Sequence, residues 1–199
     1  IFLNNTRRLN KKICNYISSS FYDSRLTSDP ITKTRSVNLK LDPIKDEGLF
    51  YVPIDHSGCS QRSDEEADLI EKTYNKIINK EFKVDKNSGK ISPKDIMVVA
   101  PYNAQANNIR ERLKKKFKDD VRVGTIDLFQ GQEAKVVLIS MTTSDVESLP
   151  RHKDFFFSRN RLNVAISRAE CVAIIIFNEN LLLASINSIK EMKLMNSFC

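Results

Sequence analysis

The sequence is poor in the residues from which metal centres and disulfide frameworks are built. Its four cysteines, at positions 14, 59, 171 and 199, are far apart and form no C-x-x-C pair. Neither a zinc finger nor a disulfide framework is therefore indicated. The two histidines, His56 and His152, have no metal-ligand neighbour at helical spacing. We expect no metal site and no Ser-His-Asp catalytic centre.

Long apolar runs are absent as well. No stretch approaches the roughly 18 residues that cross a bilayer, and no signal-peptide layout opens the chain. Together with the cysteine usage, this predicts a soluble intracellular protein, cytoplasmic or nuclear, without a membrane partner. Residue 1 is Ile rather than Met, so we expect a fragment of a longer polypeptide.

Positive charge is in excess. The chain has 32 basic and 25 acidic residues, a formal charge of +7 and a pI near 9.2. Such a surface favours polyanions, but charge determines association and not fold. At this point nucleic-acid binding and a merely basic soluble protein are equal alternatives.

The order of apolar segments predicts one domain over residues 1–199. Residues 1–46 are expected to contain a helix (12–22) and a polar connecting arm (23–46), and residues 47–199 the main α/β body. The body alternates strands with helices and has a polar loop at 85–90, which favours a parallel sheet with crossover connections. The predicted strands are 49–54, 96–100, 121–125, 136–141 and 171–177. One helix is predicted to begin after Ser63, and three more are predicted at 102–117, 161–170 and 181–192.

Ser63 and Glu66 are predicted to form a capping box, in which each side chain satisfies a free backbone amide of the other residue. The tetrapeptide DEEA at this helix start is similar to the acidic motif that holds magnesium in ATPases. That motif needs an apolar strand immediately before it, and residues 60–63 are polar. The helix-cap interpretation is therefore preferred.

Two segments carry polar residues in patterns that core or surface packing does not require. In VGTIDLFQGQEAKVVLISMT, Gln130, Gln132 and Glu133 surround Gly131 between two strands. We expect this cluster at the carboxyl end of a parallel strand, where open α/β sheets bind ligands. In NRLNVAISRAE, Arg161 and Arg168 lie seven residues apart on one predicted helix face, an arrangement that suits a phosphate. The alternative for the second segment is a solvated helix face.

These segments resemble known motifs. VGTID-x-FQGQE and RLNVA-x-SRA are similar to motifs V and VI of superfamily 1B helicases of the up-frameshift and senataxin-like family. IMVVAPYNAQ resembles a strand and corner of the same domain, and RRLN with ICNYISSSFYDSRL resembles motif IV. The motifs occur in the family's order and cover residues 5–178. The resemblance implies a RecA-like parallel sheet flanked by helices, the second motor domain of a helicase.

The resemblance also implies roles for single residues in binding ATP. Arg168 matches the arginine finger at the γ-phosphate, and Arg8 matches a second γ-phosphate contact. Glu133 matches the residue that meets the ribose, and the Gly131 amide points toward the terminal phosphate. Gln130 is expected to couple nucleotide and strand binding. The remaining nucleotide contacts are assigned to Arg7 and Arg161.

Single-stranded DNA or RNA is the implied polymer partner, held by Thr125 and by the corner Pro101, Tyr102 and Asn103. Two positions depart from the family. Arg7 stands where an aromatic residue often stacks on the base, and Ala100 stands where a threonine often precedes the corner.

The phosphate-binding half of an ATPase is missing. The five glycines, at positions 48, 58, 89, 124 and 131, form no G-x-x-x-x-G-K-[ST] loop. The resemblance implies that ATP with Mg²⁺ is bound mainly by a first RecA-like domain of the same polypeptide. We therefore expect this chain to be inactive as an ATPase alone. The alternatives are a binding module that kept the fold and, more remotely, a dinucleotide-dependent enzyme without its G-x-G-x-x-G loop.

Overall fold

Five strands form one parallel sheet in the order β4–β10–β9–β7–β8. The structure is a computed structural model that describes residues 3–144 and 159–183. The strands of this sheet are β4 (Gly48–Pro53), β7 (Ile96–Val99), β8 (Arg122–Gly124), β9 (Ala134–Ser140) and β10 (Ala169–Phe177). Because all five run the same way, the sheet has one edge where strands begin and one where they end. We call these the amino edge and the carboxyl edge.

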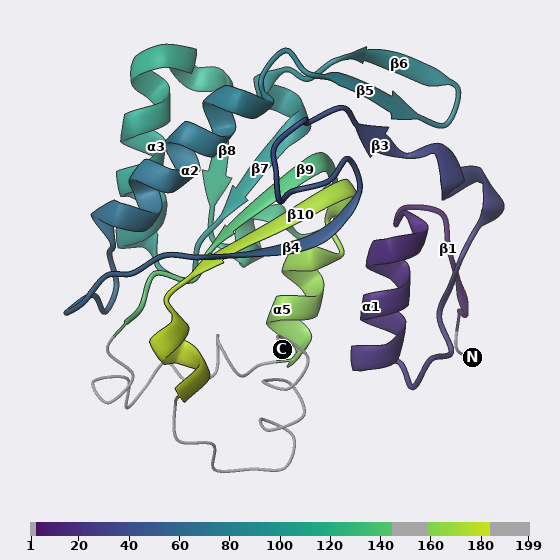
Figure 1. Cartoon of the computed structure of the whole chain (residues 1–199), viewed down its shortest axis with the longest axis horizontal. Coiled ribbons are helices and arrows are strands. Elements are labelled where there is room, and N and C mark those ends of the chain that lie inside the picture. The colour runs from purple at the N-terminus through teal and green to yellow at the C-terminus, as the bar shows by residue number, and fades with distance from the viewer. Residues whose placement is uncertain (1–2, 145–158, 184–199) are drawn as a thin grey trace.

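Helices cover both faces of the sheet (Figure 1). The helices α2 (Asp64–Ile77) and α3 (Asn103–Phe117) pack on one face, and α1 (Lys11–Phe21) and α5 (Arg159–Ile166) pack on the other. The predicted α/β fold with a parallel sheet flanked by helices is confirmed. No helix in the described part of the chain is long and apolar enough to cross a membrane.

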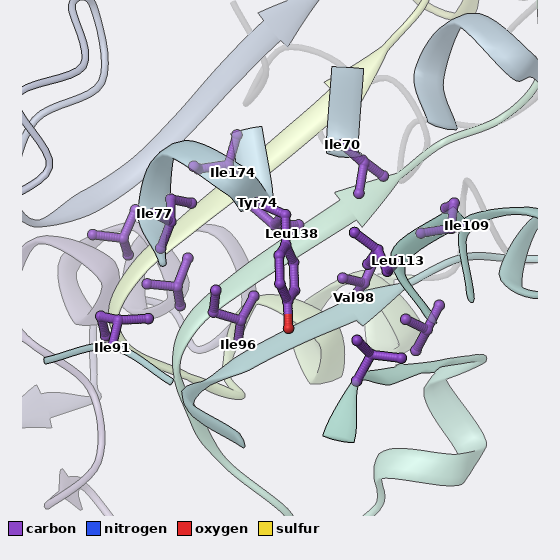
Figure 2. Packing of buried hydrophobic residues seen from close by; sticks show 14 of the residues in the cluster. Ile70, Tyr74, Ile77, Ile91, Ile96, Val98, Ile109, Leu113, Leu138 and Ile174 are labelled. Carbon is purple, nitrogen blue, oxygen red and sulfur yellow. The ribbon is translucent and has the colours of Figure 1, made fainter. Parts of the chain in front are cut away.

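The strands are apolar on both sides because both faces are covered. Alternate residues of β9 belong to different cores: Leu138 faces α2 and α3, whereas Ile139 faces α1 and α5. Figure 2 shows the first of these cores, where Tyr74 of α2 packs with Ile96 and Val98 of β7. Both cores consist of buried residues that the helices cover.

The remaining elements lie outside this sheet. A three-stranded sheet has the order β3–β5–β6, and β1 pairs with β2. These elements are β1 (Asn5–Thr6), β2 (Thr27–Ser28), β3 (Ser36–Val37), β5 (Glu81–Val84), β6 (Asn87–Lys90) and the 3₁₀ helices η1 (Pro30–Thr34), η2 (Pro93–Asp95), η3 (Lys118–Asp120), η4 (Ile126–Phe129) and η5 (Glu179–Leu183).

The predicted polar loop at residues 85–90 is wrong. This segment contains β6, which pairs with β5 in an antiparallel hairpin that β3 extends. All four residues of β6 are exposed, so the strand leaves no apolar alternation to detect. Its stability comes from backbone pairing and not from burial.

Two predicted helices also end differently. The helix predicted at 161–170 ends at Ile166, because Ala169 and Glu170 already belong to β10 and the Ala134 amide donates to the Arg168 carbonyl at 3.0 Å. The helix predicted at 181–192 overlaps η5 at residues 181–183. Residues 184–192 lie outside the described part.

The start of α2 confirms half of the predicted capping box. The Ser63 hydroxyl accepts from the Glu66 amide at 3.1 Å. The Ser63 amide, however, donates to the side chain of Gln105 at 3.0 Å. Glu66 is therefore not needed as a cap, and its carboxylate turns into the protein interior.

Candidate functional site

Three of the predicted phosphate and ribose contacts converge at the amino edge. Glu133 directly precedes β9 and Arg168 directly precedes β10, and these strands are neighbours. Arg8 reaches the same place from the segment before α1, and its Nε lies 2.8 Å from Glu133 Oε2. Residues from three distant parts of the sequence thus form one cluster, which we call the arginine cluster.

The position of this cluster corrects the sequence analysis, which placed Gln130, Gly131 and Glu133 at the carboxyl end of a strand. The chain leaves β8 at the carboxyl edge and crosses to the amino edge within residues 125–133, through η4. Only Thr125 stays at the carboxyl edge. The crossing is required because β8 and β9 are both parallel to β7.

The arginine cluster is electropositive and open to solvent. The side chains of Arg8 and Glu133 are 34% and 53% exposed. Burial, and after it the charge of Arg8, lowers the pKa of the Arg168 guanidinium, while Glu133 opposes this shift. Arg8 is paired with the Glu133 carboxylate, and Arg168 lies close enough to feel the charges of both residues. Such a group can bind a multiply charged anion through charge-assisted hydrogen bonds.

Backbone carbonyls hold Arg168 in its present position. Its Nε donates to the Val164 carbonyl at 3.1 Å, at the end of α5, and its Nη1 donates to the Gln132 carbonyl at 3.2 Å. Neutral carbonyls satisfy the guanidinium without cancelling its charge. An anionic ligand can therefore replace these acceptors at little electrostatic cost.

Arg8 is held by Arg35, a residue that the sequence analysis left in the connecting arm. Arg35 is buried, donates to the Arg8 carbonyl and forms a two-pronged ion pair with Asp85 at 2.8 and 2.9 Å. Its Nη1 also lies 3.5 Å from Glu170. The Arg35 bond lowers the pKa of Asp85, and burial raises the pKa of Glu170. No local pattern marks Arg35, because its partners are 50 and 135 residues away.

The loop before β9 is fixed by backbone conformation and by Arg122. Gly131 has a φ of +79°, in the left-handed region that favours glycine. Arg122 donates to the Glu133 carbonyl at 3.1 Å and to the Gln132 side chain at 2.9 Å. Gln130 is exposed on the same loop. These contacts hold the loop close to the arginine cluster.

The two other arginines assigned to the nucleotide, Arg7 and Arg161, are both exposed. Arg7 is 85% exposed, and its Nε pairs with Asp29 at 3.1 Å. Arg161 is exposed on α5, whereas Arg168 lies in the turn that follows this helix. The structure therefore brings together Arg8, Glu133 and Arg168.

The predicted strand-binding residues meet at the carboxyl edge. Thr125 follows β8 and Pro101 follows the end of β7, and the Ala100 amide donates to the Gly124 carbonyl at 3.0 Å. Tyr102 is 9% exposed and packs in the core, whereas Asn103 is exposed at the start of α3. The accessible polar groups of this corner are therefore the backbone, Thr125 and Asn103.

A buried hydrogen-bond network that the sequence analysis missed lies at the same edge, centred on Glu66. Its carboxylate accepts from the Thr142 amide at 2.8 Å and from the Ser140 hydroxyl at 2.5 Å, and it lies 3.1 Å from His56 Nε2. Gln105, on the first turn of α3, joins the same Ser140 hydroxyl. We call these groups the Glu66 network. Its members come from four separate segments, so no spacing rule could find it.

Fold and edge residues define a RecA-like α/β domain with a cluster of Arg8, Glu133 and Arg168 at the amino edge of its sheet. The chain belongs to the AAA domain family, whose sequence model matches residues 1–180.

The curated relatives of the chain include helicases, which confirms the resemblance to that class. The chain is 28% identical over 189 residues to DNA polymerase alpha-associated DNA helicase A of Saccharomyces cerevisiae, covering 89% of this chain and 27% of the relative. It is 34% identical over 179 residues to the Schizosaccharomyces pombe protein of the same name, covering 84% and 26%. The chain thus spans about a quarter of the length of these relatives.

Among solved structures, the C-terminal domain of a possible DNA helicase from Lactobacillus plantarum matches over 87% of this chain and 88% of that chain. The identity is 11% and the TM-score is 0.46.

Proposed function

We propose that this chain is the second motor domain of an ATP-dependent superfamily 1 helicase. In this role it supplies the arginine finger and part of the single-strand surface. The observation that carries the proposal is the convergence of Arg8, Glu133 and Arg168 at the amino edge. A binding module that does not hydrolyse a nucleotide has no need for two guanidiniums, Arg8 and Arg168, gathered beside Glu133.

The chemistry of the arginine cluster fits a nucleoside triphosphate. Arg168 contacts the γ-phosphate and neutralises the charge that builds up on the transferring phosphoryl group, an effect worth roughly 10³–10⁵ in rate in other NTPases. Arg8 makes a second γ-phosphate contact, and Glu133 accepts from the ribose hydroxyls. The Gly131 amide, on a turn where this residue has a φ of +79°, contacts the terminal phosphate.

ATP and Mg²⁺ are held mainly by a first RecA-like domain of the same polypeptide. That domain supplies the phosphate cradle and the metal, and this chain closes the site from the other side. Arg7 stacks on the base by its guanidinium plane, and Arg161 extends the positive surface beside the nucleotide. When the γ-phosphate leaves, the two domains lose their shared ligand and separate.

Single-stranded DNA or RNA is the polymer that the carboxyl edge accepts. Thr125, Asn103 and the backbone at Pro101 and Tyr102 contact the phosphates of one strand. The charge of +7 adds attraction that weakens with salt. The Glu66 network supports this surface, since Gln105 ties the start of α3 to the end of β9.

Residues 125–133 couple the two functions. Thr125 lies at the edge that contacts the strand, and Glu133 lies in the arginine cluster. Gln130 lies between them, on the part of the loop that meets the nucleotide. Repeated closure and opening of the two domains then moves the strand-binding surfaces relative to each other, which is translocation.

ATP turnover tests this proposal. We expect no measurable turnover from the purified chain, and strand-stimulated turnover from the polypeptide that joins it to the first RecA-like domain. In that polypeptide, Arg168→Ala lowers kcat by about 10³-fold or more with nucleotide affinity changed little. Lys115→Ala, which removes an exposed charge on α3, leaves kcat unchanged. Turnover by the chain alone, or an Arg168→Ala enzyme as active as Lys115→Ala, would refute the proposal.

A further inference from the structure

Three metal-ligating side chains meet at the carboxyl edge, away from the arginine cluster. His56 and Cys59 lie in the loop between β4 and α2, and Glu65 lies on the first turn of α2. One ring nitrogen, the thiol sulfur and one carboxylate oxygen all lie within 4.8 Å of one another. The three residues differ in chemistry and share no periodic spacing.

His56 is oriented as a ligand. Its side chain is completely buried, and its Nε2 lies 3.1 Å from Glu66 Oε1. The other oxygen of Glu66 accepts from the Thr142 amide, so the carboxylate acts as an acceptor and Nε2 is the nitrogen that donates. Nδ1 therefore carries the free lone pair. It has no hydrogen-bond partner among residues 3–144 and 159–183.

A buried ring nitrogen without a partner needs an explanation. Histidines that ligate a metal generally donate their other ring N–H to a carboxylate, which fixes both the tautomer and the ring plane. His56 and Glu66 have this arrangement, with Nδ1 as the free ligand atom. The Glu66 network in turn holds the carboxylate in place.

The ligand atoms of Cys59 and Glu65 lie slightly farther apart than two ligands of one zinc ion. Cys59 Sγ lies 3.9 Å from Glu65 Oε2. Bond lengths of about 2.3 Å to sulfur and about 2.0 Å to oxygen in a tetrahedral site give about 3.5 Å between these ligand atoms. The Cys59 backbone is held on both sides by Ser144, at 2.9 and 3.1 Å. Small side-chain movements are therefore enough to close the site.

We propose that His56 Nδ1, Cys59 Sγ and the Glu65 carboxylate bind one Zn²⁺ ion, whose fourth position is open to water. Nitrogen, thiolate and carboxylate ligands together suit zinc, whereas magnesium and calcium prefer oxygen alone. The ion ties the loop after β4 to the start of α2. Through Ser63 and Gln105 it stabilises the corner at residues 101–103. The sequence analysis expected no metal site because it searched for helical spacing.

Zinc binding is measured directly, by equilibrium dialysis of the chelator-stripped chain and elemental analysis, and by absorption after Co²⁺ substitution. We expect one zinc per chain, and a sulfur-to-cobalt charge-transfer band that Cys59→Ser abolishes. Cys59→Ser and Glu65→Gln each weaken zinc affinity by about tenfold or more. Glu71→Gln, which removes a carboxylate two turns along α2 outside the trio, leaves affinity and band unchanged.

Melting curves keep the result interpretable if a variant folds poorly. Zinc raises the Tm of the wild-type chain, because the ion binds the folded state, and it leaves the Tm of Cys59→Ser unchanged while circular dichroism reports an intact fold. Loss of all zinc on dialysis, or zinc retained equally by wild type and Cys59→Ser, would overturn the proposal. These readouts involve no nucleotide, so they are independent of the proposed motor function.

Discussion

The two edges of the central sheet are built on opposite physical principles. The arginine cluster at the amino edge is charged and solvent-exposed, and an ion pair with side chains 34% and 53% exposed joins Arg8 to Glu133. The Glu66 network at the carboxyl edge is buried, and the side chains of His56 and Glu66 are both fully inaccessible. The charges at the amino edge are accessible to a ligand, whereas the buried carboxylate of Glu66 at the carboxyl edge holds the surrounding loops in place.

This difference separates binding from stability. An exposed ion pair contributes about 0–1 kcal/mol, so the arginine cluster can exchange its internal partner for a ligand without loss of fold. A buried carboxylate that accepts several hydrogen bonds behaves differently. Removing one partner leaves the remaining groups buried without compensation, which lowers the free energy of unfolding. Substitutions at the amino edge should therefore change ligand binding, and substitutions at the carboxyl edge should change the free energy of unfolding.

The largest expected effect on stability is that of Glu66→Ala. Removing the carboxylate leaves the Thr142 amide and the His56 ring buried without their acceptor, which we expect to lower the free energy of unfolding by about 3–5 kcal/mol. Urea denaturation followed by circular dichroism measures the change. Glu71→Ala on the same helix is the matched control, with an expected cost under about 0.5 kcal/mol. A cost below about 1 kcal/mol for Glu66→Ala would show that the carboxyl edge does not depend on this network.

The sequence predicted what depends on neighbours along the chain. Continuous apolar runs such as residues 96–100 and 171–177 identify strands buried on both faces, and β7 and β10 lie where these runs predicted. The Ser63 cap is likewise a local contact. Motif order placed Arg8, Glu133 and Arg168 in one site, and the structure brings these three together.

What sequence reasoning missed depends on contacts between distant segments. Glu66 was expected to accept from the Ser63 amide, but Gln105, 42 residues from Ser63, takes that position. Arg35 was assigned to a connecting arm, although its partners are Asp85 and Glu170. Gly131 lies at the amino edge because β8 and β9 are both parallel to β7, so the loop that joins them must cross from one edge to the other. None of these follows from periodicity.

Gly131→Ala should have an intermediate effect, at the amino edge. The φ of +79° is strained for alanine, and a Cβ built there meets no atom within 4 Å. Backbone strain alone should therefore lower the free energy of unfolding, by about 1–2 kcal/mol. Gly131→Asn is the matched control and should cost less, because asparagine tolerates the left-handed region. Equal costs for both variants in urea denaturation would indicate crowding and not backbone conformation.

The smallest expected effect on stability is that of Glu133→Gln, which removes the charge from the ion pair with Arg8. Because both side chains are substantially exposed, the free energy of unfolding should fall by less than about 1 kcal/mol. The loss should shrink further in concentrated salt, which screens exposed charges. A double-mutant cycle with Arg8→Gln isolates the pair from other effects of each substitution. If the coupling energy reached about 2 kcal/mol, Arg8 and Glu133 would be a structural pair like that of His56 and Glu66, and the contrast between the two edges would be lost.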